Sequence, residues 1–204
     1  MRRIIFIFFI IIIFFSYIDC YSDERFLYDG LLYKNIIGKI YIPNTSINNY
    51  VLQTTDNSYY LNHAYDDTES KYGSIFLDFR NKFSDHILLL YGHNSKDDKQ
   101  ALFKDLERYK DKDFYNKNKY IYLTLGDDKY KYLIFSINIV SKDDNFHTRL
   151  DYNNMDFYRY LLTIKNDSLY DTKVDVSDDD YIITLQTCNY EPNNTYLLIN
   201  ARRI

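Results

Sequence analysis

Residues Tyr181–Ile204 read YIITLQTCNYEPNNTYLLINARRI, and this stretch bears on both the fold and the function. It contains two β-like runs, Tyr181–Thr187 and Tyr196–Ala201, and Cys188 directly follows the first run. A cysteine in this place is either a buried core residue or a nucleophile. The rest of the sequence must decide between these two interpretations.

The chain is rich in further β-like runs, which lie upstream of this stretch. They are Gly38–Pro43, Tyr50–Gln53, Ser74–Leu77, His86–Tyr91, Tyr120–Leu125 and Tyr130–Val140. The link Leu125–Tyr130 (LGDDKY) between the last two runs is typical of a hairpin turn. The strand–helix alternation that a parallel α/β sheet needs does not occur. The pattern therefore predicts a mostly β fold, an eight-stranded and closed or nearly closed β-barrel.

Three stretches have the apolar spacing of helices instead. Gln100–Lys110 places four apolar side chains on one face, and Met155–Lys165 places three on one face. Ser22–Lys34 (SDERFLYDGLLYK) begins with a plausible N-cap and predicts a short amphipathic helix. We expect peripheral helices at the first two stretches and a helical linker over residues 22–35.

Length and composition limit the class of protein. At 204 residues the chain suits one domain with a substantial core. Its 24 tyrosines fit strands and half-buried surfaces. The net charge is −4, with acidic and basic residues interspersed, so the sequence does not predict a nucleic-acid partner. The acidic runs lack the spacing of a calcium loop, so calcium binding is not predicted. We also expect no other metal ion and no cofactor.

The N-terminus has the pattern of a membrane-targeting segment. Arg2 and Arg3 precede the fifteen residues Ile4–Ile18, which are apolar except for Ser16. As a helix this run covers roughly 22 Å, less than the ~30 Å hydrocarbon core of a bilayer. Residues 1–21 thus predict a signal peptide or a membrane anchor, and the lack of a small-residue cleavage site favours the anchor. The two arginines would keep the N-terminus in the cytoplasm and place the rest of the chain outside.

The use of cysteine supports a chemical role for Cys188. The chain has two cysteines, so a disulfide framework is not indicated, although a Cys20–Cys188 bridge stays an alternative. Cys20 follows the apolar run like a lipid-modified cysteine, but the preceding Asp19 is a poor fit to that motif. A lone thiol in an oxidising exterior more often has a chemical function than a packing one.

A nucleophilic cysteine needs a proton donor and a group that holds the oxyanion. The four histidines are His63, His86, His93 and His147. His86 opens a β-like run and fits a residue at the barrel rim. His93 comes directly after that strand in a Gly-His-Asn turn, a common way to position a catalytic side chain. Spacing alone places His93 only modestly ahead of His147.

Several motifs in this chain resemble those of class B sortases, in the order that this family has them. They are GKIYIPNTSINNYVLQTTDNSYYLNH, GSIFLDFRN, LLLYGHNSKDDKQALFKDLERYKDKDFY and ITLQTCNY. The combination of YGHN, a short helix and a late TLxTC is specific. The resemblance covers about Gly38–Ile204 and implies a sortase catalytic domain over residues 36–204, with a helix before the seventh strand of the barrel.

The resemblance implies a membrane-anchored cysteine transpeptidase of Gram-positive bacteria. Such enzymes cleave a C-terminal sorting motif of NPxT type, form a thioacyl intermediate, and pass the acyl group to an amine of peptidoglycan or its precursor. By motif match Cys188 is the nucleophile and His93 is the general acid and base. The implied location is the cell membrane, with one spanning segment and the catalytic domain outside.

The chain departs from the family where an arginine on the last strand steadies the oxyanion. Tyr196 stands at that position, and Arg202 and Arg203 come too far along the strand to replace it. Arg149, in the loop expected to border the site, is a candidate replacement. Tyr196 is another candidate, although a neutral donor is weaker than a charged one. Gln186 and Thr187, directly before Cys188, are further candidates beside the substrate.

Two alternative functions remain open from the sequence. A non-catalytic protein of the same fold could bind sorting signals or a cell-wall partner, and the missing arginine is the feature that favours it. A thiol hydrolase would release peptides rather than join them.

Overall fold

The computed structural model describes residues 27–28, 31–32, 34–150 and 154–204. Its strands are β1 (Leu27–Tyr28), β2 (Leu31–Leu32), β3 (Ile36–Tyr41), β4 (Asn48–Leu52), β5 (Ile75–Leu77), β6 (Ile87–Tyr91), β7 (Tyr120–Leu125), β8 (Asp128–Ser141), β9 (Ile182–Asn189) and β10 (Thr195–Arg203). Its helices are the 3₁₀ helices η1 (Tyr59–Leu61) and η2 (Lys104–Lys110) and the α-helices α2 (Lys112–Lys117) and α3 (Asn154–Asn166).

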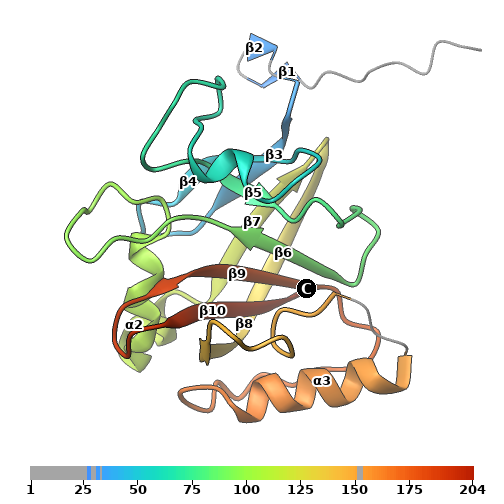
Figure 1. Cartoon of the computed structure of the whole chain (residues 1–204). Helices are drawn as coiled ribbons and strands as arrows, with labels where there is room; N and C mark the ends of the chain where they lie inside the picture. The colour runs from blue at the N-terminus through green and yellow to red at the C-terminus, as the bar shows by residue number, and fades with distance from the viewer. Residues whose placement is uncertain (1–26, 29–30, 33, 151–153) are drawn as a thin grey trace, which may run out of the picture.

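Eight of these strands form a closed barrel in the order β10-β8-β7-β3-β4-β5-β6-β9 (Figure 1). Neighbouring strands are antiparallel except for two parallel pairs, β4 with β5 and β6 with β9. The parallel pair β6–β9 matters for the site, because both strands run toward the same end of the barrel. The segments that follow them therefore lie side by side.

The barrel interior is filled by alternate apolar side chains of its strands. Along β7 (YIYLTL), Ile121, Leu123 and Leu125 are buried, while Tyr120 and Tyr122 are exposed on the outer face. Such alternation is what one buried sheet face requires. It is also the pattern from which the strand was predicted.

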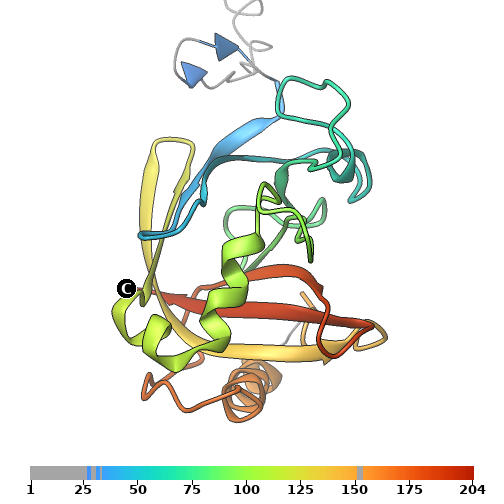
Figure 2. The same cartoon turned by 90° about the vertical axis from the view of Figure 1, so that its left-hand side faces the viewer.

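Helix α3 covers part of the outer face of the barrel. Phe157, Leu161 and Ile164 of the helix form an apolar cluster with Phe135 of β8 and Ile182 of β9. Figure 2 views α3 end-on, directly beneath the long strands of the sheet.

Polar residues also lie on the face under α3. The Asn138 side chain donates to the Ile164 carbonyl at 2.9 Å, and Asn200 donates to Asn138 at 2.9 Å. These side chains are satisfied by one another and by the helix backbone, as buried polar groups require. They hold α3 over the first part of β9 and the last part of β10, and leave the part of these strands near Cys188 uncovered.

The structure confirms the predicted barrel and all eight of its strands, with shifts of a few residues at their ends. Gly126, with a φ of 56°, lies in the β7–β8 hairpin turn, within the predicted link. The helix predicted at Met155–Lys165 is α3, and it precedes β9, the seventh strand of the barrel along the chain.

Two helix predictions need correction. In the linker, Leu27 pairs with Leu32 and Tyr28 with Leu31, so the predicted helix is wrong at these residues. The sequence between the two strands is Asp-Gly, a pair that favours a two-residue hairpin turn. At Gln100–Lys110 the structure has the 3₁₀ helix η2, which begins only at Lys104, and a further helix, α2, follows Asp111.

The predictions for residues 1–21 lie outside the described residues. In the part of the chain that the structure describes, no helix has the length and apolar character needed to cross a bilayer.

Candidate active site

Cys188 lies near the end of β9 on the outer face of the barrel. Ile183 and Leu185 of β9 belong to the core, so strand alternation places Gln186 and Cys188 on the opposite face, where both are partly exposed. The thiol is free. Its position is therefore accessible to a substrate and is not that of a core residue.

The segment after β6 is hydrogen-bonded along the end of β9. The Gly92 N–H donates to the Gln186 carbonyl at 3.3 Å, and the Thr187 hydroxyl donates to the Gly92 carbonyl at 2.7 Å. Two residues after Gly92, the Asn94 side chain donates to the Cys188 carbonyl at 2.9 Å. His93 stands between these two attachment points and is thereby held beside Cys188.

Gly92 is required by close packing. A Cβ atom at this position would lie 2.7 Å from the Phe103 ring, which is buried in the core. The Phe103 N–H also donates to the His93 carbonyl at 2.8 Å. Because the ring and the backbone both press against this turn, the turn can approach β9 only with glycine at position 92.

The His93 ring has a defined orientation. Its Nε2 atom lies 2.7 Å from the Leu61 carbonyl oxygen at the end of η1. A carbonyl only accepts hydrogen bonds, so Nε2 carries the proton. The other nitrogen, Nδ1, is then the atom that can exchange a proton with a substrate.

Asn94 links the two halves of this site, and we did not identify it from the sequence. Its buried side chain also donates to Glu107 of η2 at 2.7 Å, and its carbonyl accepts from the Tyr190 hydroxyl at 2.9 Å. Burial raises the pKa of Glu107, but hydrogen bonds from Asn94 and Lys104 outweigh burial and hold it below its ordinary value. The sequence feature that could have pointed to Asn94 is its position directly after His93 in the Gly-His-Asn turn.

Tyr196 is the direct cross-strand partner of Cys188. Paired residues on neighbouring strands point to the same face, so the Tyr196 ring borders the thiol. On the other side of Tyr196, the Lys142 ammonium lies 5.5 Å from the centre of the ring. Lys142 is a second residue that sequence reasoning missed, since it stands in a run of exposed loop residues with no motif.

The remaining predicted site residues are placed as follows. Gln186 lies two residues before Cys188 on the same face, and its Oε1 atom is buried with no hydrogen-bond partner among the described residues. Thr187 points inward and secures the Gly92 carbonyl. Arg149 is exposed in the loop after β8, and its N–H donates to the Phe146 carbonyl at 3.4 Å.

The other three histidines make contacts that indicate structural roles. His147 is buried, with Nδ1 3.1 Å from Asp144 and Nε2 3.3 Å from Asp167, the residue after α3. His86 stacks on Tyr181, as its interpretation as a barrel-rim residue predicts. His63 stacks on Tyr59 at 4.0 Å between ring centres.

Arg202 and Arg203 lie at the far end of β10 from Tyr196. Arg202 pairs with Asp180 at 3.1 Å, and Arg203 lies over the Tyr181 ring at 3.9 Å. Both guanidinium groups thus have partners away from Cys188, in agreement with the sequence argument from strand length.

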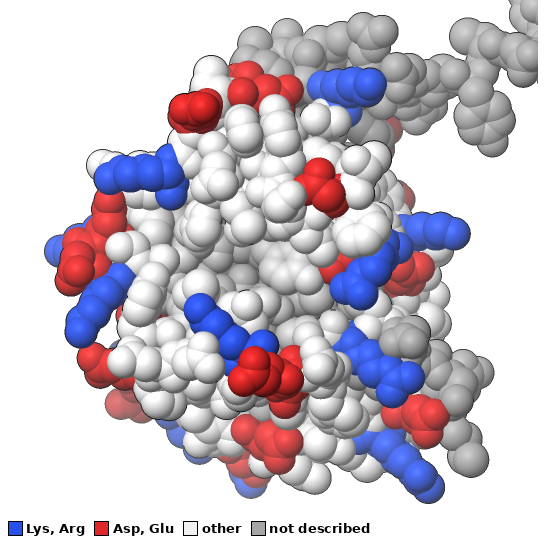
Figure 3. All heavy atoms as spheres, in the orientation of Figure 1, with Lys and Arg blue, Asp and Glu red and all other residues white. Residues whose placement is uncertain are grey.

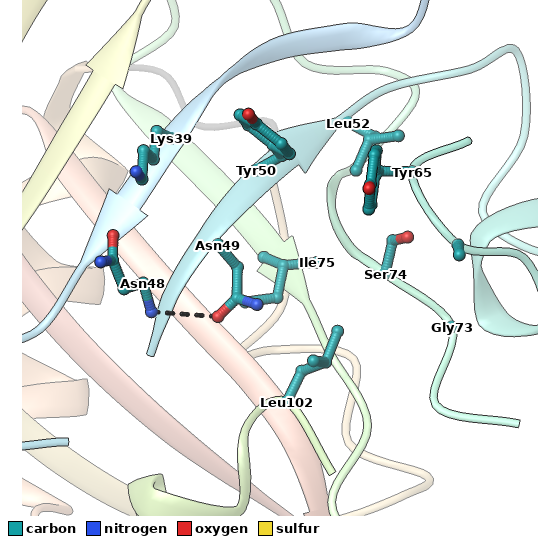
Figure 4. A pocket seen from close by; sticks show the side chains of 11 residues that line it. Lys39, Asn48, Asn49, Tyr50, Leu52, Tyr65, Gly73, Ser74, Ile75 and Leu102 are labelled. Carbon is teal, nitrogen blue, oxygen red and sulfur yellow. Dashed lines mark hydrogen bonds between the residues drawn. The ribbon is translucent and has the colours of Figure 1, made fainter. Parts of the chain in front are cut away.

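A pocket of about 420 Å³ opens on another part of the barrel (Figure 4). Lys39, Asn48 and Tyr50 line it from β3 and β4, and Ser74 and Leu102 line it from the opposite side. Strands β5 and β6 separate β4 from β9, so this pocket does not contain Cys188.

The distribution of charge on the surface fits the composition. Figure 3 shows uncharged side chains over the centre of one face, with acidic and basic side chains intermingled around its margin.

A closed barrel with a partly exposed cysteine on one strand, tied to a histidine turn on its parallel neighbour, is the arrangement that the sequence resemblance implies. The sortase domain model matches residues 40–204. The chain therefore belongs to the sortase family.

The relatives point to class B within this family. The chain is 38% identical over 162 residues to sortase B of Listeria monocytogenes, covering 78% of this chain and 65% of the relative. It is 37% identical over 176 residues to sortase B of Staphylococcus aureus, covering 84% of this chain and 71% of the relative. The X-ray structure of Clostridium perfringens sortase B superposes with a TM-score of 0.79 at 31% identity, covering 83% of this chain and 94% of that one.

Proposed function

We propose that this protein is a cysteine transpeptidase that cleaves a C-terminal sorting motif of NPxT type and transfers the protein to a peptidoglycan amine. The observation that carries the proposal is the hydrogen bonding of Gly92 and Asn94 to β9, which holds His93 beside the partly exposed Cys188. A Staphylococcus aureus sortase B structure that is 35% identical, with a TM-score of 0.77, is a substrate complex, which supports a peptide as the ligand.

In the first half of the reaction, the Cys188 thiolate attacks the carbonyl carbon of the motif threonine. The tetrahedral intermediate collapses, the C–N bond breaks, and the leaving amine takes a proton from Nδ1 of protonated His93. The carboxyl-terminal fragment departs, and the rest of the substrate remains bound to Cys188 as a thioester.

In the second half, an amine attacks the thioester carbonyl and gives up a proton to Nδ1 of the now neutral His93. The C–S bond breaks, which releases the joined product and regenerates the thiolate. Because Nε2 donates to Leu61 throughout, the ring can load and unload its proton at Nδ1 without turning.

The proposed location of the enzyme is the outer face of the cell membrane, anchored by residues 1–21, with surface proteins and peptidoglycan as partners. The charge pattern of the first residues and the secretory character of the apolar run support this location.

The test uses the purified full chain in detergent with a fluorogenic NPxT-type peptide, and triglycine as the amine. The wild type should cleave the peptide and form the triglycine adduct, which mass spectrometry detects. Cys188→Ala should abolish both products, and undiminished cleavage by this variant would refute the proposal. Cleavage with no adduct would identify a hydrolase instead, and binding without turnover would identify the non-catalytic alternative.

A further inference from the structure

Tyr196 stands where the resemblance to class B sortases leads us to expect an arginine. Without that arginine, the site at Cys188 needs another source of positive charge. The oxyanion of an acyl-transfer intermediate is best held by charged or strongly polarised donors. Tyr196 is the cross-strand partner of Cys188 and is neutral. A compensating cation should therefore lie against Tyr196.

Strand register places Lys142 on that side of the site. Val140 of β8 pairs with Tyr196, and Ser141 pairs with Thr195. The next N–H, that of Lys142, donates to the Asn194 carbonyl at 3.1 Å, so the extended pairing continues by one residue. Alternation then directs Lys142 to the same face as Val140 and Tyr196. Its ammonium lies 5.5 Å from the centre of the Tyr196 ring.

This ammonium is not neutralised by a carboxylate among the described residues. The nearby Asp144 is occupied by the His147 ring and by the backbone N–H groups of Phe146 and His147. The Lys142 side chain is exposed, and the Tyr196 ring holds it on the Cys188 side of the strand.

We propose that Lys142 is a positioning residue that, together with Tyr196, supplies the positive charge beside the oxyanion at Cys188. In this proposal the Tyr196 hydroxyl is the donor to the oxyanion, and the ammonium on the Tyr196 ring polarises that hydroxyl and stabilises the anionic intermediate. Two strand spacings, about 10 Å, separate the β9 and β8 backbones, so the ammonium acts across the ring of Tyr196. The inference rests on the proposed function.

The first experiment measures kcat and KM for the NPxT-type peptide with Lys142→Met and Lys142→Arg. Since the loss of one oxyanion donor costs about 10²–10³-fold in kcat, a cation acting through Tyr196 should cost about tenfold, mainly in kcat. Lys142→Arg should restore most of the rate, because it keeps the charge and binds aromatic faces. The control is Lys131→Met, since Lys131 lies 4.0 Å from the Tyr120 ring on another part of the barrel.

A second experiment does not depend on the peptide. The rates at which Cys188 reacts with an anionic and a cationic methanethiosulfonate reagent are compared in each variant. Lys142 should favour the anionic reagent, Lys142→Met should lower that preference, and Lys142→Arg should restore it. An unchanged preference overturns the inference. If the wild type cleaves no peptide, the proposed function fails, whereas a lowered preference still places the charge at Cys188.

The last test introduces an arginine at position 196. In a Tyr196→Arg background the guanidinium supplies the charge directly, so Lys142→Met should then change kcat by less than about twofold. An equal loss of rate in both backgrounds would show that Lys142 acts independently of Tyr196 and would refute the pairing.

Discussion

The two strands that flank β9 support Cys188 in different ways. On the β6 side, hydrogen bonds of 2.7–3.3 Å from Gly92, Thr187 and Asn94 attach the histidine turn to the cysteine strand. On the β10 side, the pairing of Tyr196 with Cys188 is followed by a loose contact of 5.5 Å between a ring and an exposed ammonium. The β6 side fixes the position of His93 relative to Cys188, and the β10 side supplies the positive charge of Lys142.

This difference has energetic consequences. An unsatisfied buried polar group costs about 1–3 kcal/mol, whereas an exposed cation–π contact contributes about 0.5–1 kcal/mol. Substitutions on the β6 side should therefore lower stability together with activity. Those on the β10 side should change the rate with little change in the free energy of unfolding.

The largest effect is expected for His93→Ala, which removes the proton donor and acceptor. General acid–base catalysis contributes about 10²–10⁴-fold, so kcat/KM for the peptide should fall by that factor. Alkylation of Cys188 should continue, because the thiol remains accessible. His86→Gln is the control, since His86 also adjoins β6 but is exposed and stacks on Tyr181. A loss of less than tenfold for His93→Ala would remove His93 from the mechanism.

Asn94→Ala should lower both activity and stability. The substitution removes the side-chain donor to the Cys188 carbonyl and leaves the Glu107 carboxylate with the hydrogen bond from Lys104, which costs about 1–3 kcal/mol of the free energy of unfolding, measured with urea. Asn116→Ala, at an exposed position of α2, should be neutral. Wild-type stability for Asn94→Ala would mean that the β6 side is not fixed by this bridge.

The sequence predicted the β6 side better than the β10 side, for a physical reason. Strand periodicity depends on local residues and predicted the barrel, whereas His93 and Cys188 were proposed mainly from the resemblance of the YGHN and TLxTC motifs to those of class B sortases. Asn94 and Lys142 act through partners far along the chain, at Cys188 and Tyr196, which no local pattern reveals. The helix predicted for the linker is wrong at Leu27–Tyr28 and Leu31–Leu32 because apolar residues on both sides of an Asp-Gly sequence also favour a hairpin.

Low pH should lower the stability of the β6 side of the site by protonating Asp78. Burial raises the pKa of this carboxyl, but hydrogen bonds from Arg80, Tyr91 and Asn57 outweigh burial and lower it to about 2. Because the folded pKa lies below the ordinary 3.8, the stabilisation is complete above about pH 4 and is lost as the pH falls toward 2.

The loss for Asp78 should be about 2 kcal/mol, read from urea unfolding at a series of pH values. In Asp78→Asn the slope between pH 4 and 2 should become shallower. Asp66→Asn is the comparison, since that carboxylate is exposed and accepts hydrogen bonds from the nearby Thr68. Equal slopes for the wild type and Asp78→Asn would contradict the assignment.

The smallest effect is expected for Gln186→Met, on the open face beside Cys188. The Oε1 atom has no hydrogen-bond partner among the described residues, so we expect it to accept from a backbone N–H of an extended peptide bound on this face. Replacing it should raise KM by about 2–10-fold, the equivalent of one hydrogen bond, and leave kcat unchanged. Stability should stay the same or rise, because an unpaired polar atom is removed. A fall in kcat with constant KM would instead assign Gln186 to the charge-bearing side with Tyr196 and Lys142.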